Sequence, residues 1–399
     1  MCSSDLFGGP SWTRVSEPDG SPGQWYYHLF AAEQPDFNWE NPEVLAEFER
    51  IFRFWLDRGV DGFRIDVSDA LIKDTTWPDT EGHWPIIPKD DASPVHAIYR
   101  RLRTVMDEYD GDRMAVVETG APDDVVALFI RSDEMHLAFN FRFVKAQWNA
   151  ADFRSAIEES LAANSIVKAP TTWVTENHDV TRSVTRYGSG IRLAGEYVPD
   201  SQQQSSIDLE LGTRRARAVA LMLLTLPGAV YIYNGQELGL PNVDDLPDEV
   251  LQDPSFFRTH GEVRGRDGCR IPLPWSHAGV SAGFSSSSST WLPIPNYYRD
   301  FAADLQRQDA SSMLRLYQQA LHLRRKHPAL RRGKLSWLES SDGVLGYVVQ
   351  TESEQFEVWV NFTDSPIAMP AGRAMLASLT ADSQEVLLPN SAIILLKSG

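Results

Sequence analysis

The sequence predicts an α/β protein in which helices cover parallel strands, followed by a smaller antiparallel β region. Apolar and β-branched runs alternate with segments of helical periodicity through most of the chain, and this alternation is typical of parallel sheets. Beyond residue 335 the pattern changes to short alternating runs, such as 344–349 and 356–360, which predict antiparallel strands. With 399 residues and 42% hydrophobic content, the chain can bury one large domain with an accessory one.

The elements follow in order from periodicity and punctuation. Residues 1–40 are irregular and aromatic, and a helix is expected to begin at Asn41-Pro42, since proline suits a first helical turn. The next expected elements are a strand within 59–67, a proline-rich loop at 75–94, a helix at 95–109, strands at 114–118 and near 135–141, a helix near 151–163, and a strand at 171–176. An arginine-rich helix at 212–226, a strand at 229–233, a loop-rich stretch from 234 to 298 and a helix at 311–326 complete the first region.

A charged pair interrupts the first of these strands. Residues two apart on a strand share a face, so Arg64 and Asp66 are expected to point together, opposite Phe63, Ile65 and Val67. A buried aspartate needs a partner, and the guanidinium is expected to lower the pKa of Asp66 and keep it ionised, as a nucleophile must be. A purely structural ion pair is the alternative interpretation.

Two further carboxylates end later apolar runs. Glu118 closes the run that begins at Ala115, and Asp179 follows the run that begins at Thr171. Carboxylates at the C-terminal ends of several parallel strands are the arrangement by which barrel enzymes place their chemistry. Glu118 has no Arg or Lys within three positions on its C-terminal side, so it is expected to keep its proton.

Composition excludes several classes of function. Lys and Arg number 37 against 55 Asp and Glu, and the formal charge of −18 argues against a nucleic-acid or anionic-membrane partner. Only Cys2 and Cys269 are present, so neither a disulfide framework nor a cysteine metal site is expected. No apolar run has the roughly 18 residues that cross a bilayer, and the first residues do not form a secretory signal. We therefore predict a cytoplasmic protein.

These motifs carry a resemblance to a known family. The chain resembles the α-amylase superfamily (glycoside hydrolase family 13), most closely its oligo-1,6-glucosidase and α-glucosidase branch. Residues 62–67 match the family's second conserved region, Glu118 matches the third, and Asn177-His178-Asp179 matches the fourth. Further similarity lies at 28–39, at Arg182 and Arg186, and at 231–237.

The resemblance implies roles for individual residues. Asp66 would be the nucleophile, Glu118 the general acid/base, and Asp179 the carboxylate that contacts sugar hydroxyls and stabilises the transition state. The implied substrate-binding residues are Arg64, His178, Arg182 and Val67. For Arg182, a structural pair with Asp179 or Glu176 is the alternative. In this branch a Val directly after the nucleophile accompanies action on α-1,6 bonds.

The resemblance also implies a departure at the front of the chain. Family members carry three further strands and a His-bearing region before the nucleophile, but only 65 residues precede Asp66. We therefore expect an N-terminally truncated, incomplete (β/α)8 TIM barrel (strands 4 to 8) followed by a small C-terminal antiparallel β domain. The expected division is 1–40 as a remnant of the inserted loop domain, 41–330 as a partial catalytic barrel, and 331–399 as a β-sandwich domain. The open strand edge of such a fragment predicts inactivity and aggregation.

The function implied is that of a retaining, exo-acting α-glucosidase that removes glucose from short α-1,6- or α-1,4-linked oligosaccharides, with no cofactor. The calcium loop of some members falls in the part expected to be missing. A transglycosylase or sucrose isomerase of the same family is one alternative; sucrose isomerases carry an Arg/Asp-rich patch where residues 140–146 here lack Asp, which disfavours isomerisation. A non-catalytic, transporter-associated glycosidase-like domain is another, and it would need a membrane anchor and usually a broken triad.

Overall fold

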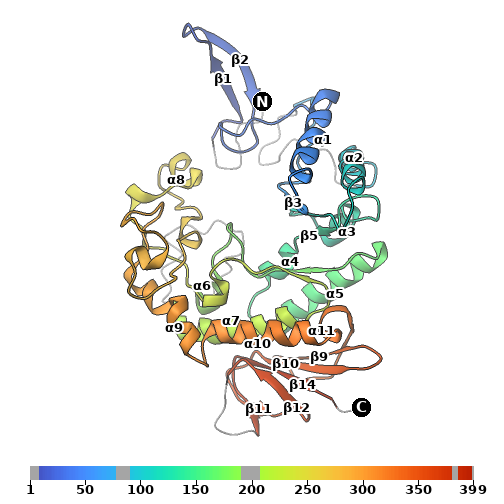
Figure 1. Ribbon diagram of the computed structural model, residues 1–399, viewed down its shortest axis with the longest axis vertical. Coiled ribbons are helices and arrows are strands. Elements are labelled where there is room, and N and C mark those ends of the chain that lie inside the picture. The colour runs from blue at the N-terminus through green and yellow to red at the C-terminus, as the bar shows by residue number, and fades with distance from the viewer. Residues whose placement is uncertain (1–8, 78–89, 190–206, 380–384, 398–399) are drawn as a thin grey trace. The chain divides into compact units, whose positions relative to one another are not determined.

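The computed structural model describes residues 9–77, 90–189, 207–379 and 385–397, and these form two compact units. Unit 1 takes its described residues from 1–139, 160–170 and 254–263, and unit 2 takes the rest. Each unit is described by itself below, with the element labels of Figure 1. The predicted divisions at residues 40 and 330 stay predictions.

Unit 1 begins with a β-hairpin where the sequence predicted an irregular segment, and that prediction was wrong. Strands β1 (Trp12–Ser16) and β2 (Pro22–Tyr27) pair antiparallel, with Trp12 opposite Tyr27. The ring of Trp12 lies edge-on to Tyr27 and to Trp77, at centroid distances of 5.3 and 4.9 Å. Aromatic contacts across and beyond the hairpin therefore compensate for the Pro and Gly residues that made the segment look irregular.

The centre of unit 1 is a parallel sheet in the order β3–β4–β5, as predicted. Its strands are β3 (Gly62–Ile65), β4 (Met114–Val117) and β5 (Leu137–Ala138). The strands approach closely at Gly62, where an added Cβ would lie 2.2 Å from the carbonyl oxygen of Met114. Any larger residue at this position would clash with the Met114 carbonyl and push the two strands apart.

Helices of unit 1 cover this sheet. Helix α1 (Pro42–Leu56) begins at the predicted proline, and the Asn41 side chain caps it by accepting from the backbone N–H of Glu43 at 3.0 Å. Its Phe52 ring stacks on Phe63 of β3 with centroids 4.2 Å apart. The other helices with all their residues in unit 1 are α2 (Val95–Asp107), α3 (Asp123–Leu128) and α8 (Pro254–Arg258).

Unit 2 contains a second parallel pair, β6 (Thr172–Trp173) and β7 (Ala229–Val230). The predicted arginine-rich helix is α7 (Leu209–Thr225), whose second half is buried from Ala218 onward, and it packs against α10 (Met313–Lys326). The remaining α-helices are α4 (Phe141–Lys145), α6 (Ser183–Ser189), α9 (Ala303–Gln308) and α11 (Ala329–Arg332), while α5 (Ala150–Val167) belongs in part to each unit. Short 3₁₀ helices lie at Gln236–Leu238, Asp248–Val250, Asp267–Cys269, Val280–Gly283 and Asn296–Phe301.

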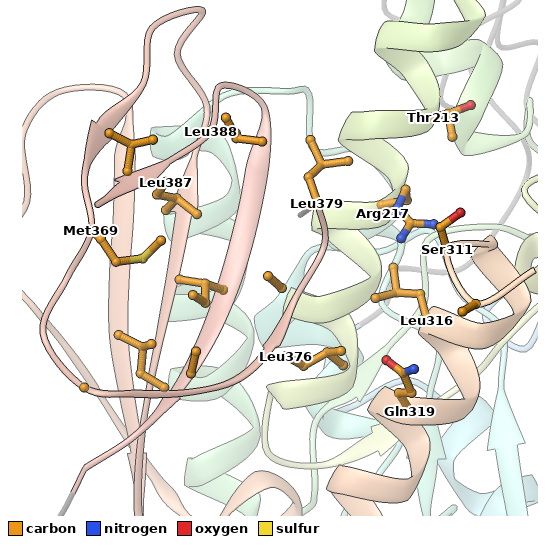
Figure 2. Close-up of a pocket in the computed structure, with 17 residues that line it drawn as sticks. Thr213, Arg217, Ser311, Leu316, Gln319, Met369, Leu376, Leu379, Leu387 and Leu388 are labelled. Carbon is orange, nitrogen blue, oxygen red and sulfur yellow. The ribbon is translucent and has the colours of Figure 1, made fainter. Parts of the chain in front are cut away.

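The C-terminal region of unit 2 is antiparallel, as predicted. A five-stranded sheet has the order β12–β14–β10–β9–β8, and β11 pairs with β13 beside it. The strands are β8 (Lys334–Trp337), β9 (Val344–Gln350), β10 (Gln355–Asn361), β11 (Ile367–Ala368), β12 (Arg373–Ala377), β13 (Val386–Leu387) and β14 (Ser391–Leu396). Helix α7 packs on β14 and β10. A cavity of about 1000 Å³ lies here, lined by Arg217 of α7 and by aliphatic side chains such as Leu376 and Leu387 (Figure 2).

None of the helices in the described part of the chain combines the length and apolar character that crossing a bilayer requires.

Candidate active site

The parallel pairing of β3 and β4 brings the first cluster of predicted site residues together, and all of them lie in unit 1. The two strands run in register, with Ile65 opposite Val117, so Asp66 and Glu118 follow the same edge of the sheet. The backbone N–H of Glu118 donates to the carbonyl of Ile65 at 2.9 Å, and that of Ser68 donates to the carbonyl of Glu118 at 2.8 Å. Two short apolar strands thus present both carboxylates side by side.

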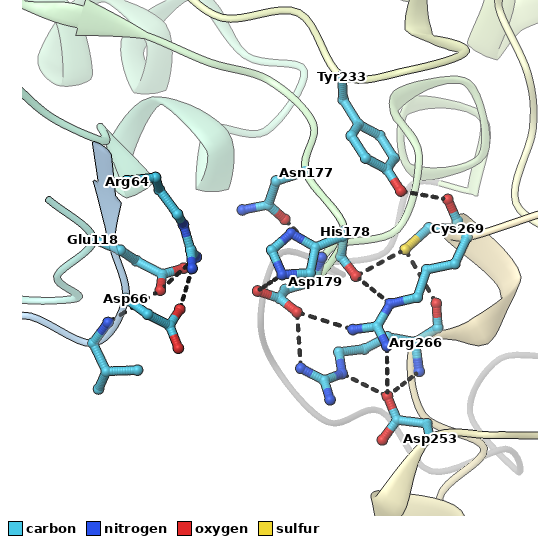
Figure 3. Close-up of polar contacts among 12 residues, drawn as sticks. Arg64, Asp66, Glu118, Asn177, His178, Asp179, Tyr233, Asp253, Arg266 and Cys269 are labelled. Carbon is cyan, nitrogen blue, oxygen red and sulfur yellow. Dashed lines mark hydrogen bonds and ion pairs between the residues drawn. The ribbon is translucent and has the colours of Figure 1, made fainter. Parts of the chain in front are cut away.

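Arg64 joins the two carboxylates (Figure 3). One guanidinium nitrogen pairs with Asp66, as predicted, and Nη2 lies 2.7 Å from Oε2 of Glu118. The sequence around Glu118 holds no cation on its C-terminal side, and the cation that contacts it comes from the neighbouring strand, which the local sequence does not reveal. The expectation that Asp66 is buried was wrong. The strand ends at Ile65 and Asp66 lies in the following turn, with its side chain 63% exposed.

Glu118 differs from Asp66 in its surroundings. Its side chain is only 14% exposed. Burial, followed by its interaction with the Asp66 carboxylate, raises the pKa of Glu118 from 4.5 to about 7, although Arg64 and the backbone N–H of Val67 act in the opposite direction. Near neutral pH this group is shared between its protonated and ionised forms, as an acid/base catalyst requires.

Val67 directly follows Asp66 and lies close to Glu118 in space. Its backbone is left-handed, with φ at 43°, and its N–H donates to Oε2 of Glu118 at 3.4 Å. The side chain packs partly buried against a cluster formed by Tyr27, Leu29 and Ala70. It therefore does not share the environment of Phe63 and Ile65, which pack against the core beneath α1.

Unit 2 holds the second cluster, at Asn177, His178 and Asp179. The Asn177 side chain accepts from the backbone N–H of Asp179 at 2.8 Å, which fixes the loop after β6. Nε2 of His178 lies 3.4 Å from Oδ2 of Asp179, and the imidazole is 48% exposed. Both side chains therefore remain accessible, with Asp179 at 27% exposure.

Two arginines that sequence reasoning missed hold Asp179 (Figure 3). Arg266 and Arg270 donate to its Oδ1 at 2.8 and 3.1 Å. Arg266 also donates through Nε, at 2.6 Å, to Asp253, whose side chain is fully buried. These residues lie in the loop-rich stretch after 234. The available signal was the pair of arginines four positions apart before the Ile271-Pro272 run, in a region where charges have no helical reason to recur.

Arg182 is buried and does not face solvent. Its side chain is 1% exposed, and its nitrogens donate to the carbonyls of Asn234 and Cys269 at 3.0 and 2.9 Å. Nη1 also lies 3.4 Å from Oε2 of Glu176, the partner named in the structural alternative. Arg182 thus ties the loop after β6 to the segments at 234 and 269. No group of three or more His, Cys, Asp or Glu side chains among the described residues is arranged to hold a metal ion.

Comparison with known proteins places this geometry in a family. The family model "Alpha amylase, catalytic domain" matches residues 1–333. The chain belongs to the alpha-amylase family.

Relatives carry related names. The chain is 30% identical to a probable alpha-glucosidase of Rhizobium meliloti and 29% identical to an oligo-1,6-glucosidase of Parageobacillus thermoglucosidasius, each over 90% of this chain. It spans 64% and 66% of the length of these two relatives. Among solved structures it is similar to the alpha-glucosyl transfer enzyme XgtA, with a TM-score of 0.79, 28% identity, and coverage of 99% of this chain and 74% of that one. It is also similar to the trehalulose synthase MutB of Pseudomonas mesoacidophila, with a TM-score of 0.78, 26% identity, and coverage of 98% and 74%.

Proposed function

We propose that this chain carries the catalytic residues of a retaining, exo-acting α-glucosidase that cleaves terminal α-1,6 or α-1,4 bonds of short oligosaccharides. The observation that carries the proposal is the pair formed by Glu118 and Asp66. One carboxyl group is buried with its pKa raised to about 7, and the other is exposed beside the same guanidinium. The names of the relatives support an α-glucosidic substrate.

The chemistry proceeds in two steps. In the first, the Asp66 carboxylate attacks the anomeric carbon, the glycosidic C–O bond breaks, and the proton of Glu118 passes to the departing oxygen. In the second, the Glu118 carboxylate takes a proton from water, the hydroxide oxygen bonds to the anomeric carbon, and the Asp66–sugar ester bond breaks. Two inversions give net retention, and both side chains return to their starting protonation states.

The remaining residues receive supporting roles. Asp179 contacts sugar hydroxyls, with Arg266 and Arg270 holding its carboxylate, and the exposed imidazole of His178 donates to the same sugar. For Arg182, full burial favours the structural alternative over substrate contact, so we assign it to loop positioning. The finer fold assignment, in which β3 to β7 are strands four to eight of an incomplete (β/α)8 barrel, is part of this proposal and is supported by the parallel order within each unit.

Transglycosylation or sucrose isomerisation is the second candidate, favoured by the similarity to XgtA and to the trehalulose synthase. Both reactions use the same covalent intermediate and differ in what attacks it. Helix α4 supplies Arg142 and Lys145 but no Asp, and Arg142 is occupied by Glu159 at 2.6 Å. This departure from the Arg/Asp-rich patch expected of sucrose isomerases favours hydrolysis.

The test identifies the products and measures how substitutions change kcat. Because the chain spans only 64% and 66% of the alpha-glucosidase and oligo-1,6-glucosidase relatives and is expected to be inactive alone, the test uses the protein expressed together with the sequence that precedes it in its gene. It is incubated with 4-nitrophenyl α-glucoside, isomaltose, maltose and sucrose, and proton NMR identifies the first-formed anomer. We expect α-glucose first, with Asp66→Asn lowering kcat by about 10⁴-fold or more. Asp61→Asn, at the other end of the same strand, is the matched control and should leave kcat unchanged. β-Glucose as the first product, or full activity in Asp66→Asn, would contradict the proposal, and isomaltulose or trehalulose from sucrose would support the second candidate.

A further inference from the structure

The turn after β3 contains an unusual backbone conformation. Val67 has φ at 43°, in the left-handed region that β-branched residues strongly avoid. Among the described non-glycine residues with positive φ, it is the one that is β-branched; the others are Trp77, Lys168, His260, Ser281, Ala282 and Asn390. A conformation this unfavourable persists only where surrounding contacts impose it, and such residues cluster at functional sites.

The contacts that impose it come from the residues after Val67. Ser68 is fully buried; both its backbone N–H and its hydroxyl donate to the carbonyl of Glu118, at 2.8 and 2.7 Å. Its own carbonyl accepts the hydroxyl of the buried Tyr99 at 2.6 Å. One step further, Asp69 accepts the hydroxyl of Thr119 at 2.7 Å. Three hydrogen bonds thus hold the end of the turn to the residues that follow β4, and a fourth holds it to Tyr99 of α2.

This fastening determines where the carboxylates lie. Asp66 directly precedes Val67, and Glu118 is the residue whose carbonyl receives both bonds from Ser68. The Val67 N–H also points to the Glu118 carboxylate, at 3.4 Å. With φ in the usual β region, near −120°, the chain leaving Asp66 would turn away, and Ser68 could not reach β4. The spacing of Asp66 and Glu118 therefore depends on the left-handed conformation of Val67.

We propose that the left-handed turn at Val67, fastened by Ser68 to the end of β4, is a positioning device that holds the Asp66 and Glu118 carboxylates next to each other. Its catalytic consequence rests on the proposed function, whereas its structural consequence does not. Val67 and Ser68 are positioning residues, and what sets the spacing of the two carboxylates at residue 67 is the sign of φ and not the side chain.

The first test changes only the permitted φ. Val67→Pro fixes φ near −65° and forbids the turn, whereas Val67→Gly adopts positive φ without strain. We expect Val67→Pro to lower kcat about 100-fold, the scale of a 1 Å misplacement, with KM changed less than threefold. Val67→Gly should retain kcat within threefold on 4-nitrophenyl α-glucoside, whose leaving group is not a sugar and so does not test linkage preference. Lys168→Pro is the matched control, because Lys168 also has positive φ and an N–H donated to a carbonyl, that of Ser165 at 3.2 Å. It should leave kcat unchanged.

The second test needs no substrate and separates this proposal from the proposed function. In unit 1 the groups facing the Glu118 carboxylate are Arg64, Asp66 and the N–H of Val67. The titration of ¹³C-labelled Glu118, assigned by comparison with Glu118→Gln, should move toward lower pH in Val67→Pro. Proline also removes the N–H of residue 67, a donor that lowers the pKa of Glu118, but losing the larger effect of the Asp66 carboxylate outweighs this. The titration of Glu118 should keep its wild-type position in Val67→Gly. If the protein lacks glycosidase activity but the titration behaves in this way, the positioning stands and the proposed function fails.

A third variant covers the case in which Val67→Pro does not fold. Ser68→Ala removes one of the bonds to the Glu118 carbonyl, and Ser160→Ala is its control, a buried serine whose hydroxyl donates to Asp123 at 2.9 Å. We expect about tenfold loss of kcat in the first and none in the second. Unchanged kcat and unchanged Glu118 titration in both Val67→Pro and Ser68→Ala would overturn the proposal.

Discussion

Replacing Glu118 by Gln should stabilise the protein at neutral pH but not in mild acid. In the folded protein Glu118 has a pKa of about 7, raised from 4.5 mainly by burial. A carboxyl group whose pKa is raised on folding binds more protons in the folded state between those two pKa values. The folded protein therefore loses stability as the pH rises through that range. One pKa unit corresponds to about 1.36 kcal/mol, so wild type should lose about 2.5 kcal/mol relative to Glu118→Gln between pH 5 and pH 8.

Urea unfolding of both proteins at pH 5, 6, 7 and 8 measures this difference. Because the two proteins differ only at residue 118, the difference in free energy of unfolding reports Glu118 together with the groups that interact with it. Glu108→Gln is the control: Arg53 lowers the pKa of this exposed carboxylate, so its contribution is lost only below about pH 4.5, and its difference from wild type should not change between pH 5 and pH 8. A difference between wild type and Glu118→Gln that does not change with pH would refute the reasoning, because it would mean that Glu118 titrates as an ordinary glutamate.

Four further outcomes are expected. The kcat/KM of the proposed glucosidase should fall above about pH 7, where Glu118 loses its proton, and Glu118→Gln should impair isomaltose more than 4-nitrophenyl α-glucoside, because the acid matters most for a basic leaving oxygen; equal losses on both substrates would argue against the acid/base role. Val67→Ala should lower the ratio of kcat/KM for isomaltose to that for maltose, and an unchanged ratio would remove Val67 from linkage preference. Gly62→Ala should lower the free energy of unfolding by more than about 2 kcal/mol in urea titration, since its Cβ would clash with the Met114 carbonyl; wild-type stability would show that β3 and β4 can move apart.

The strongly periodic elements could be predicted from the sequence. Helix α1 begins at the expected Pro42, and α10 ends where His327-Pro328 follows it. The parallel strands were found in the right places but are shorter than predicted, because their ends bend into turns that apolar composition does not reveal. The N-terminal hairpin was missed, since its stability comes from ring contacts of Trp12 with Tyr27 and Trp77, which are distant in sequence.

The candidate site shows the same division between local and tertiary information. The pairing of Arg64 with Asp66 followed from their spacing of two. The contact of Arg64 with Glu118 depends on the register of two strands, and the support of Asp179 by Arg266 and Arg270 spans about ninety residues. Contacts of this range depend on how the chain folds back, so a single sequence indicates the participants only through motif resemblance.

In the proposed mechanism, burial separates the roles of the two carboxyl groups, and the choice of ion-pair partner does not. Arg64 contacts both groups, so a guanidinium alone would favour the ionised form of each. Glu118 is nevertheless raised to a pKa of about 7, which requires that desolvation and the neighbouring Asp66 charge outweigh the attraction of Arg64. Asp66 escapes the desolvation because β3 ends one residue earlier and leaves its side chain 63% exposed. In the proposed mechanism, the length of a four-residue strand therefore decides which carboxyl group attacks and which delivers a proton.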